Sequence, residues 1–372
     1  MPLSKNNAST KESNHHDSVL FDESLKGLNI KPDGIYIDAT LGRCGHAQGI
    51  LNHLNDSGRV IGFDQDIDAI QYAENNFPDS RLGLVHCNFS KLNNELNKIE
   101  LIGKVDGILM DLGISSPQID NADRGFSFNK DGALDMRMDQ SKRITAAEWL
   151  KETSEKEIAD ALYQYGEEKR SRIIASTIKD YQKSNEIKTT LELANLISTV
   201  VKPGKNKHPA TRSFQAIRIA INDELITLSE ALTQSIDALK KGGRLAIISF
   251  HSIEDRIVKQ FIQKHSRPKQ IPKGLPIMMN NTQPCLLKDL GKVKSSNEEI
   301  KIRGSFKCNC LTISLRVILS AVAVSAITGT FGNLSFICPS CVYSFLKSCP
   351  QDEIQCASSI ANKEISIFFK KF

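Results

Sequence analysis

The chain has few of the features that mark secreted proteins. Of its nine cysteines, only Cys44, Cys87 and Cys285 lie before position 303, which is too few for a disulfide framework and consistent with a reducing compartment. Residues 1–16 are polar and expected to be disordered, and they lack the apolar segment of a signal peptide. We therefore expect a cytoplasmic protein.

A strong excess of one charge is also missing. The formal net charge is +5, but residues 1–302 hold 41 Lys and Arg against 40 Asp and Glu, and the last 70 residues hold 7 against 3. A basic field over the whole molecule is thereby excluded, so any affinity for nucleic acid has to come from local stretches. Aromatic residues make up 6%, with one tryptophan, which leaves few side chains for base stacking.

The last part of the chain, residues 303–372, differs in character from the rest. Residues 317–346 carry no charge, a length that could span a membrane, but glycine, proline and many hydroxyl residues make this a poor membrane helix. We favour an atypical tail, for instance one produced by a change of reading frame, and expect no membrane partner. The other six cysteines lie here, and neither Cys308-Asn-Cys310 nor Cys338-x-x-Cys341 fits a known zinc spacing, so no metal is expected.

From residue 33 onward, short apolar runs alternate with helical segments. The apolar runs predict strands at 35–40, 59–64, 82–89 and 104–111. Helical spacing between them predicts helices at 47–54 and 68–77. Strands joined by single helices indicate an α/β protein with a doubly wound, mainly parallel sheet, whose ligands bind at the carboxyl ends of the strands.

The alternation stops after residue 111 and returns near residue 208. In between, apolar residues recur at helical spacing over 145–166, 167–182 and 191–201. A further helical region over 212–243, closed by glycines, leads into an apolar strand over 244–250. The sequence thus predicts a sheet domain made of residues 17–119 and 208–302, interrupted at 120–207 by a helical insert that recognises the substrate.

The segments IDATLGRCGH (37–46) and GFDQD (62–66) predict a nucleoside site. A glycine turn lets backbone N–H groups approach a ligand, and Asp64 at the end of the next strand can accept both ribose hydroxyls. The dinucleotide fingerprint G-x-G-x-x-G is absent. Asp38 would repel a pyrophosphate but suits the cationic sulfonium or amino group of S-adenosylmethionine. An ordinary strand–turn–helix unit with a solvated acid is the alternative.

The segment DLGISSPQ (111–118) ends the fourth strand with an acid and a Ser-Pro turn. Methylation of an amine needs an acceptor that holds the NH₂ group with its lone pair aimed at the methyl carbon. A carboxylate or an amide at a strand end, here the carboxylate of Asp111, can supply this acceptor. A plain strand end followed by a turn is the alternative interpretation.

Two stretches without any acid, 200–222 and 256–288, are candidates for phosphate contact. A solvated basic face is the alternative, because most charge runs have no partner. The RNA-binding candidates in the first stretch are Lys202, Lys205, Lys207, Arg212 and Arg218.

Taken together, these segments resemble the bacterial small-subunit ribosomal RNA cytosine-N4 methyltransferase family. The resemblance covers about residues 14–302 and is carried by GRVIGFDQD (58–66), LIGKVDGILMDLGISSPQID (101–120), RGFSFNKDGALDMRMD (124–139) and GGRLAIISFHSIEDRIVKQF (242–261). It implies a Rossmann-like methyltransferase fold with a helical insert and S-adenosylmethionine as the methyl donor. The implied substrate is the decoding-site cytosine of 16S rRNA in the small ribosomal subunit.

The resemblance also implies particular site residues. In our leading hypothesis Asp111 is the catalytic residue, lying between the cofactor and the target amine. By matching position, the family's cofactor contacts fall on Cys44, Gly45, His46, Asp64, Phe89, Asp111 and Gln118.

Two departures from the family pattern leave alternatives open. Cys44 replaces the usual glycine of the turn, so a positive φ there would be strained. The family ends with an Asn-Pro-Arg-containing segment and a final strand, whereas this chain reads RGSFKCNCLTISLRV (303–317), in which 311–317 could still form that strand. A family member that binds RNA or cofactor without transferring a methyl group is the second hypothesis. A nucleotide-dependent dehydrogenase, disfavoured by the missing fingerprint, is the third.

Overall fold

The computed structural model describes residues 18–141, 144–204, 208–267, 285–294 and 314–320, the last of these as backbone only. All of them belong to one compact unit, Met1–Ala321. The polar N-terminal segment, the cysteine pairs of the tail and most of the uncharged run 317–346 lie outside the described residues. Within the described part, no helix is long and apolar enough to cross a bilayer, and no cluster of His, Cys, Asp or Glu could hold a metal.

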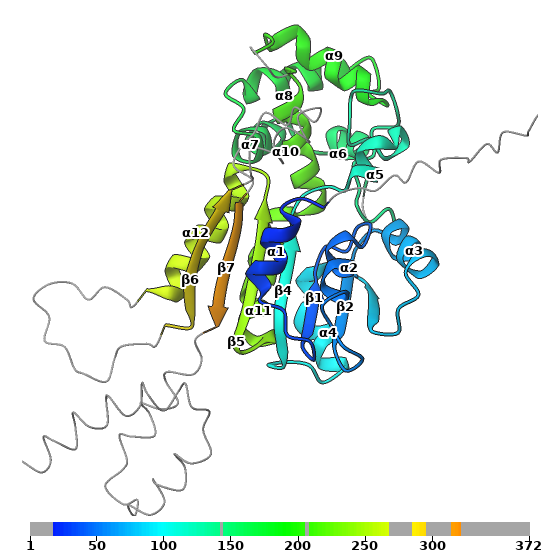
Figure 1. The fold of residues 1–372 in the computed structure, drawn as a ribbon. Helices are drawn as coiled ribbons and strands as arrows, with labels where there is room; N and C mark the ends of the chain where they lie inside the picture. The colour runs from blue at the N-terminus through cyan, green and yellow to red at the C-terminus, as the bar shows by residue number, and fades with distance from the viewer. Residues whose placement is uncertain (1–17, 142–143, 205–207, 268–284, 295–313, 321–372) are drawn as a thin grey trace, which may run out of the picture. The chain divides into compact units, whose positions relative to one another are not determined.

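Seven strands form one sheet in the order β3-β2-β1-β4-β5-β7-β6 (Figure 1). The first five in this order are parallel, and β7 pairs antiparallel with both β5 and β6. The doubly wound, mainly parallel sheet expected from the sequence is therefore confirmed. The strands are β1 (Ile35–Asp38), β2 (Arg59–Asp64), β3 (Leu82–His86), β4 (Val105–Asp111), β5 (Leu239–Ser249), β6 (Leu287–Lys294) and β7 (Ser314–Ser320).

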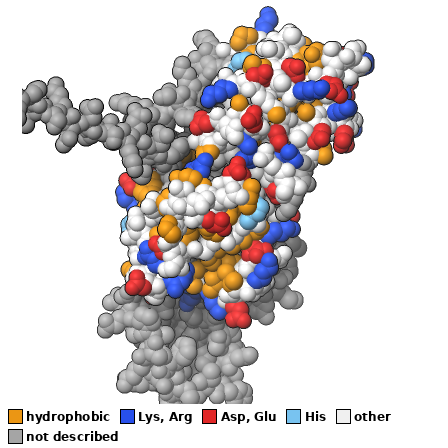
Figure 2. Space-filling view, turned by 90° about the vertical axis from the view of Figure 1, so that its right-hand side faces the viewer, with side chains coloured by type: hydrophobic (Ala, Val, Ile, Leu, Met, Phe, Trp, Pro, Cys, Tyr) orange, Lys and Arg blue, Asp and Glu red, His pale blue; other side chains and the backbone are white. Residues whose placement is uncertain are grey.

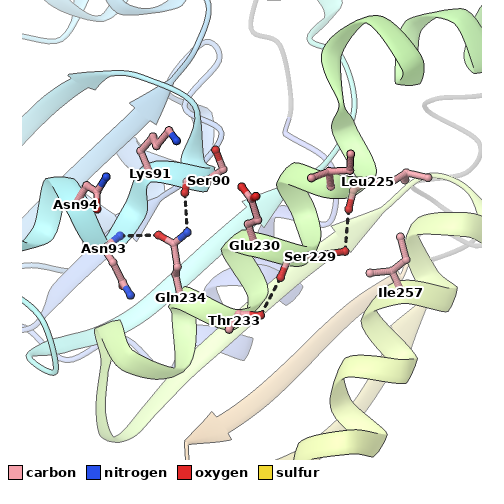
Figure 3. Close-up of a pocket in the computed structure, with 11 residues that line it drawn as sticks. Ser90, Lys91, Asn93, Asn94, Leu225, Ser229, Glu230, Thr233, Gln234 and Ile257 are labelled. Carbon is pink, nitrogen blue, oxygen red and sulfur yellow. Dashed lines mark hydrogen bonds between the residues drawn. The ribbon is translucent and has the colours of Figure 1, made fainter.

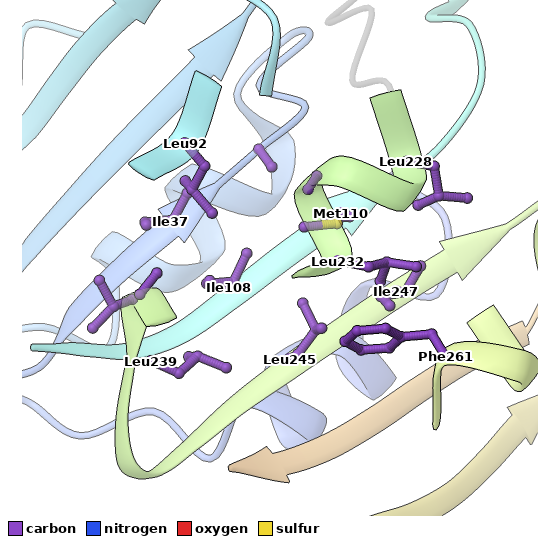
Figure 4. Close-up of a cluster of buried hydrophobic side chains, with 14 of the residues drawn as sticks. Ile37, Leu92, Ile108, Met110, Leu228, Leu232, Leu239, Leu245, Ile247 and Phe261 are labelled. Carbon is purple, nitrogen blue, oxygen red and sulfur yellow. The ribbon is translucent and has the colours of Figure 1, made fainter. Parts of the chain in front are cut away.

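Helices cover both faces of the sheet, because successive side chains of a buried strand point to opposite sides. Tyr36 of β1 belongs to the apolar cluster with α1 (Phe21–Leu28), α2 (Gly45–Leu51) and α3 (Ile67–Asn76). Its neighbour Ile37 belongs to the cluster with α4 (Leu92–Lys98), α11 (Glu224–Ala238) and α12 (Ser252–Ser266). Figure 4 shows this second cluster, which contains Met110 of β4 and Leu228 of α11. Each such buried side chain contributes about 1.5–3 kcal/mol.

The helical insert between β4 and β5 has an apolar core of its own. This core contains Leu150, Ile158, Ile174, Leu193 and Phe214. Phe214 belongs to α10, which our division of the sequence assigned to the second part of the sheet domain, so α10 also packs in the insert. Capping boxes explain several of the helix starts, since a Thr or Ser side chain and a Glu three residues later bond each other's backbone N–H. The elements are α5 (Ser116–Asp120), η2 (Ala122–Arg124), α6 (Ala146–Glu152), α7 (Glu155–Gly166), α8 (Ser171–Gln182), α9 (Thr190–Val200) and α10 (Thr211–Asn222).

Some predicted boundaries were wrong. The region 212–243 is not one helix, because Asp223 with a φ of 49° separates α10 from α11, and its last five residues belong to β5. The register against β4 shifts there, a bulge that Gly242 allows with a φ of 79°. The third strand ends at His86, before Phe89, since Asn88 caps the short helix η1 (Phe89–Lys91) by accepting the N–H of Ser90.

The sequence analysis allowed for a final strand over residues 311–317, and β7 overlaps this segment. Residues 311–313 lie outside the described part. The strand lies between β5 and β6 (Figure 1). In the described sheet, β6 is therefore hydrogen-bonded to the other strands through β7.

Candidate active site

Three carboxylates lie at the carboxyl ends of neighbouring strands. Asp38 ends β1, Asp64 ends β2 and Asp111 ends β4, and β1 lies between the other two. Thr40 links two of them, because its N–H donates to Asp38 Oδ1 at 3.2 Å and its Oγ1 accepts the N–H of Asp111 at 2.7 Å. The strand order thus brings together acids that are more than seventy residues apart in the sequence.

The turn after β1 is held by the carboxylate of Asp64. Its Oδ2 accepts the N–H of Gly42 at 2.9 Å, and its Oδ1 accepts the N–H of Asp66 at 2.8 Å. Gly42 has a φ of 51°, and buried Cys44 has a φ of 63°. The conformation that a glycine would adopt freely is thus imposed on a cysteine, at a cost of about 1–2 kcal/mol. A side chain at Gly45 would displace Ser18, because its Cβ would lie too close to Ser18 Oγ.

The electrostatics of this turn favour a cationic ligand. Burial, together with the nearby negative charge of Asp64, raises the pKa of Asp38 to about 7, and burial raises the pKa of Asp64 to about 6. Asp38 is 1% exposed, and its buried Oδ2 has no hydrogen-bond partner among the described residues. A positive group bound beside these carboxylates would offset their desolvation, whereas a phosphate would be repelled.

His46 connects the turn to the N-terminal segment and to Asp111. The ring is buried, stacks on Phe21 with 6.1 Å between centroids, and donates from Nε2 to the carbonyl of Val19 at 3.0 Å. Its other nitrogen, Nδ1, lies 3.8 Å from Asp111 Oδ2. With the proton on Nε2, the imidazole presents an acceptor nitrogen towards Asp111.

The remaining predicted cofactor residues lie around the next strands. Gln118 is buried; its Oε1 accepts the N–H of Ser115 at 3.0 Å and its Nε2 donates to Asp66 Oδ2 at 2.7 Å. Phe89 is half-buried at the start of η1 and packs against the sheet cluster that contains Ile37. Gln118 therefore reaches the turn of Asp64 through Asp66, which the sequence did not single out.

Three residues of this region were missed by the sequence reasoning. Thr40, Asp66 and Arg124 all make bonds that shape the turn. Thr40 and Asp66 stand inside motifs that were quoted, and the second acid of GFDQD was a signal that we did not use. Arg124 also begins a quoted segment, RGFSFNKDGALDMRMD (124–139), but nothing local marked it as buried, because an arginine after a polar turn is typical of a solvated surface.

An open hollow of about 880 Å³ lies between the segment of η1 and α4 on one side and α11 on the other (Figure 3). Gln234 joins its two walls, since its amide donates to the carbonyl of Ser90 at 2.6 Å and accepts the N–H of Asn93 at 2.8 Å. None of the three strand-end carboxylates lines it. The hollow is therefore a separate surface feature, adjacent to Phe89 along the chain.

The predicted RNA-binding residues differ in how available their charges are. Lys202 and Arg212 are exposed, although Arg212 also donates to the carbonyl of Glu167 at 3.2 Å. Arg218 is 13% exposed and forms a double hydrogen bond with Glu224, at 2.8 Å for each contact. Lys205 and Lys207 lie outside the described residues. On the face shown in Figure 2, basic and acidic side chains are intermixed over the upper part, which holds the insert.

Comparisons with known proteins show the family of the chain. The model of the MraW methylase family matches residues 13–312. The chain is 62% identical over 286 residues to "Ribosomal RNA small subunit methyltransferase H" of Vesicomyosocius okutanii, covering 77% of this chain and 93% of the relative. It is 49% identical over 307 residues to the protein of that name in Shewanella violacea, covering 81% and 97%. A solved rRNA methylase from Streptococcus thermophilus matches 80% of this chain and 92% of its own, at 12% identity and a TM-score of 0.34.

Proposed function

Since the chain belongs to the MraW methylase family, we propose that its strand-end site transfers a methyl group from S-adenosylmethionine to small-subunit ribosomal RNA. The target is the N4 amine of the decoding-site cytosine, cytosine 1402 of 16S rRNA. The observation that carries the proposal is the set of three carboxylates at adjacent strand ends around a glycine turn. The reaction takes place in the cytoplasm, on the small ribosomal subunit.

The residues of the turn fit this cofactor. Asp64 uses one lone pair of each oxygen for a backbone N–H, which leaves acceptors for the two ribose hydroxyls. Asp38 and the segment 42–46 hold the cationic methionine end, where the raised pKa of Asp38 falls once a positive charge is bound. Phe89 packs beside the adenine. S-adenosylmethionine supplies an electrophilic methyl group on a positively charged sulfur.

Asp111 aligns the target amine. Its carboxylate accepts a hydrogen bond from the N4–H, which turns the nitrogen lone pair towards the methyl carbon and raises its electron density. As the bond between N4 and the methyl carbon forms, the bond between sulfur and that carbon breaks, and S-adenosylhomocysteine leaves with the electron pair. The nitrogen, now cationic, releases a proton that the Asp111 carboxylate can accept directly or through water. The backbone N–H of Asp111 donates to Thr40 Oγ1, which fixes the position of Asp111 at the end of β4, and the His46 ring lies beside its carboxylate.

Methyl transfer to small ribosomal subunits that lack this modification tests the proposal. With tritiated cofactor, label is expected in 16S rRNA, and nuclease digestion should locate it on the N4 atom of one cytosine. Cofactor binding without any label would contradict methyl transfer and favour a module that only binds. Label on another atom or nucleotide would contradict the assigned target.

Replacing Asp64 with alanine should weaken cofactor binding by about 2–3 kcal/mol, because charge-assisted hydrogen bonds to the ribose are lost. Calorimetric titration with S-adenosylmethionine measures the effect. Asp56→Ala is the control, since Asp56 is an exposed acid of the loop before β2. Equal affinity of the two variants would remove Asp64 from the ribose site.

Neutralising Lys202, Lys205 and Lys207 together with glutamine should weaken binding to the small subunit. Losing about three phosphate contacts lowers the slope of log K against log salt by roughly 2–3. Filter binding at several salt concentrations measures the slope. A triple variant of Lys151, Lys183 and Lys188 removes the same charge from lysines of the insert that pair with acids, and it should keep the slope. Equal slopes for the two triple variants would contradict the phosphate contacts.

A further inference from the structure

The buried carboxylate of Asp66 contacts three separate segments: the start of α3, Gln118 of α5 and Arg124 of η2. Its Oδ1 accepts the N–H of Asp68 at 3.1 Å and thereby caps α3. Its Oδ2 lies 2.7 Å from Gln118 Nε2, which donates to it, and 2.7 Å from a terminal nitrogen of Arg124. The same guanidinium nitrogen of Arg124 also lies 3.1 Å from Asp68.

A shift of Asp66 would move the proposed ribose-binding residue. The N–H of Asp66 donates to Asp64 Oδ1 at 2.8 Å, so the two residues form one tight turn at the end of β2. Asp64 in turn holds Gly42 in the turn after β1. The conformation of the turns after β1 and β2, which form the proposed cofactor site, therefore depends on the contacts that hold Asp66.

Arg124 holds Asp66 from the side of the insert. Its second terminal nitrogen donates to the carbonyls of Arg137 at 3.1 Å and Met138 at 3.0 Å. Asn222 of α10 anchors that segment, because its side chain accepts the N–H of Met138 at 2.9 Å and donates to the carbonyl of Met136 at 2.8 Å. The segment lies close to η2 because position 125 is glycine, whose Cβ would lie 2.4 Å from the carbonyl oxygen of Ala133.

Burial makes this arrangement specific to arginine. Arg124 is 4% exposed and Asp66 is 5% exposed, so neither charge can be left alone without a large desolvation cost. A guanidinium presents several N–H groups in one rigid plane, which can meet a carboxylate on one side and two carbonyls on the other. We propose that Arg124 is a positioning residue, which holds the Asp64–Asp66 turn in the conformation that binds the cofactor. The proposal rests on the proposed function for the identity of that cofactor.

Titration of the Arg124→Gln variant with S-adenosylhomocysteine, in the absence of RNA, tests the proposal. We expect a dissociation constant about 10-fold to 100-fold above that of the unchanged protein, because the turn is no longer held in place. In the methyl-transfer assay the KM for S-adenosylmethionine should rise by the same factor, while kcat at saturating cofactor stays within about 3-fold. Arg81→Gln is the matched control, since Arg81 also joins a carboxylate, that of Asp79, and a backbone carbonyl.

A second variant separates positioning from folding. Asp66→Asn combined with Arg124→Gln leaves no buried charge unpaired and keeps a side chain that can cap α3, so the protein should fold and still bind the cofactor weakly. Arg124→Lys should be intermediate, because one ammonium group cannot reach all the partners. Unchanged affinity in Arg124→Gln or in the double variant would overturn the proposal and leave the proposed function intact. Absence of binding by the unchanged protein would instead contradict the proposed cofactor, and the positioning role with it.

Discussion

Asp111→Asn should lower the rate of methyl transfer on the order of 10³-fold, with little change in the affinity for the small ribosomal subunit. The amide has the size of the carboxylate, but it cannot take up the proton that the target nitrogen releases, and half of its polar surface consists of donors. The amide oxygen can still accept the hydrogen bond from the amine, but the amide NH₂ competes for the same position, so the amine is aligned for reaction less often. The hydrogen bond from the backbone N–H of residue 111 to Thr40 is unaffected, so we expect the variant to keep its fold and lose only activity.

Single-turnover methyl transfer and filter binding on the same subunit preparation measure the two effects. Asp120→Asn is the control, because Asp120 is an exposed acid at the end of α5, nine positions further along the chain. A rate within about tenfold of the unchanged protein would show that alignment by other groups is sufficient and that Asp111 is not the catalytic residue.

Ending the chain at residue 302 should lower the free energy of unfolding by on the order of 5 kcal/mol, because the ladders of β7 with β5 and β6 are both lost. One edge of β5 is then exposed along its length, which also promotes aggregation. A chain that ends at residue 320 retains β7 and should unfold like the full-length protein. Comparing the two truncated chains separates the contribution of β7 to stability from that of the residues after 320.

Urea unfolding followed by circular dichroism measures both truncated chains against the full-length protein. If the chain ending at residue 302 keeps the midpoint and slope of the unfolding curve, β7 contributes nothing to the sheet. The sequence after position 302 would then not belong to the folded domain, as its departure from the ending of the family first indicated. Loss of cooperativity in that chain alone would place residues 314–320 in the folded domain.

Local patterns in the sequence determined the fold class and grouped the acids of the candidate site. Helix and strand periodicities are properties of neighbouring residues, so β2 was located at its exact bounds and α8 and α9 within a few residues, whereas the segment 145–166, taken as one helical stretch, is two helices, α6 and α7. The acids Asp38, Asp64 and Asp111 were identified because the carboxyl ends of parallel strands meet at one edge of the sheet. Because the family has glycine at position 44, the sequence also indicated that Cys44 would be strained if its φ were positive, and its φ is 63°.

Only the tertiary structure decided which charges are paired and which backbone segments meet. Arg124 and Asp66 are 58 positions apart, and nothing local distinguishes a buried guanidinium from a solvated one, so their ion pair could not be predicted. Arg218 stood in an acid-free stretch, yet the helix that follows brings Glu224 to it. The bulge in β5 and the place of β7 between β5 and β6 depend in the same way on long-range pairing. Periodicity indicates which face of an element is buried, but the partner that covers that face is set by the packing of the whole chain.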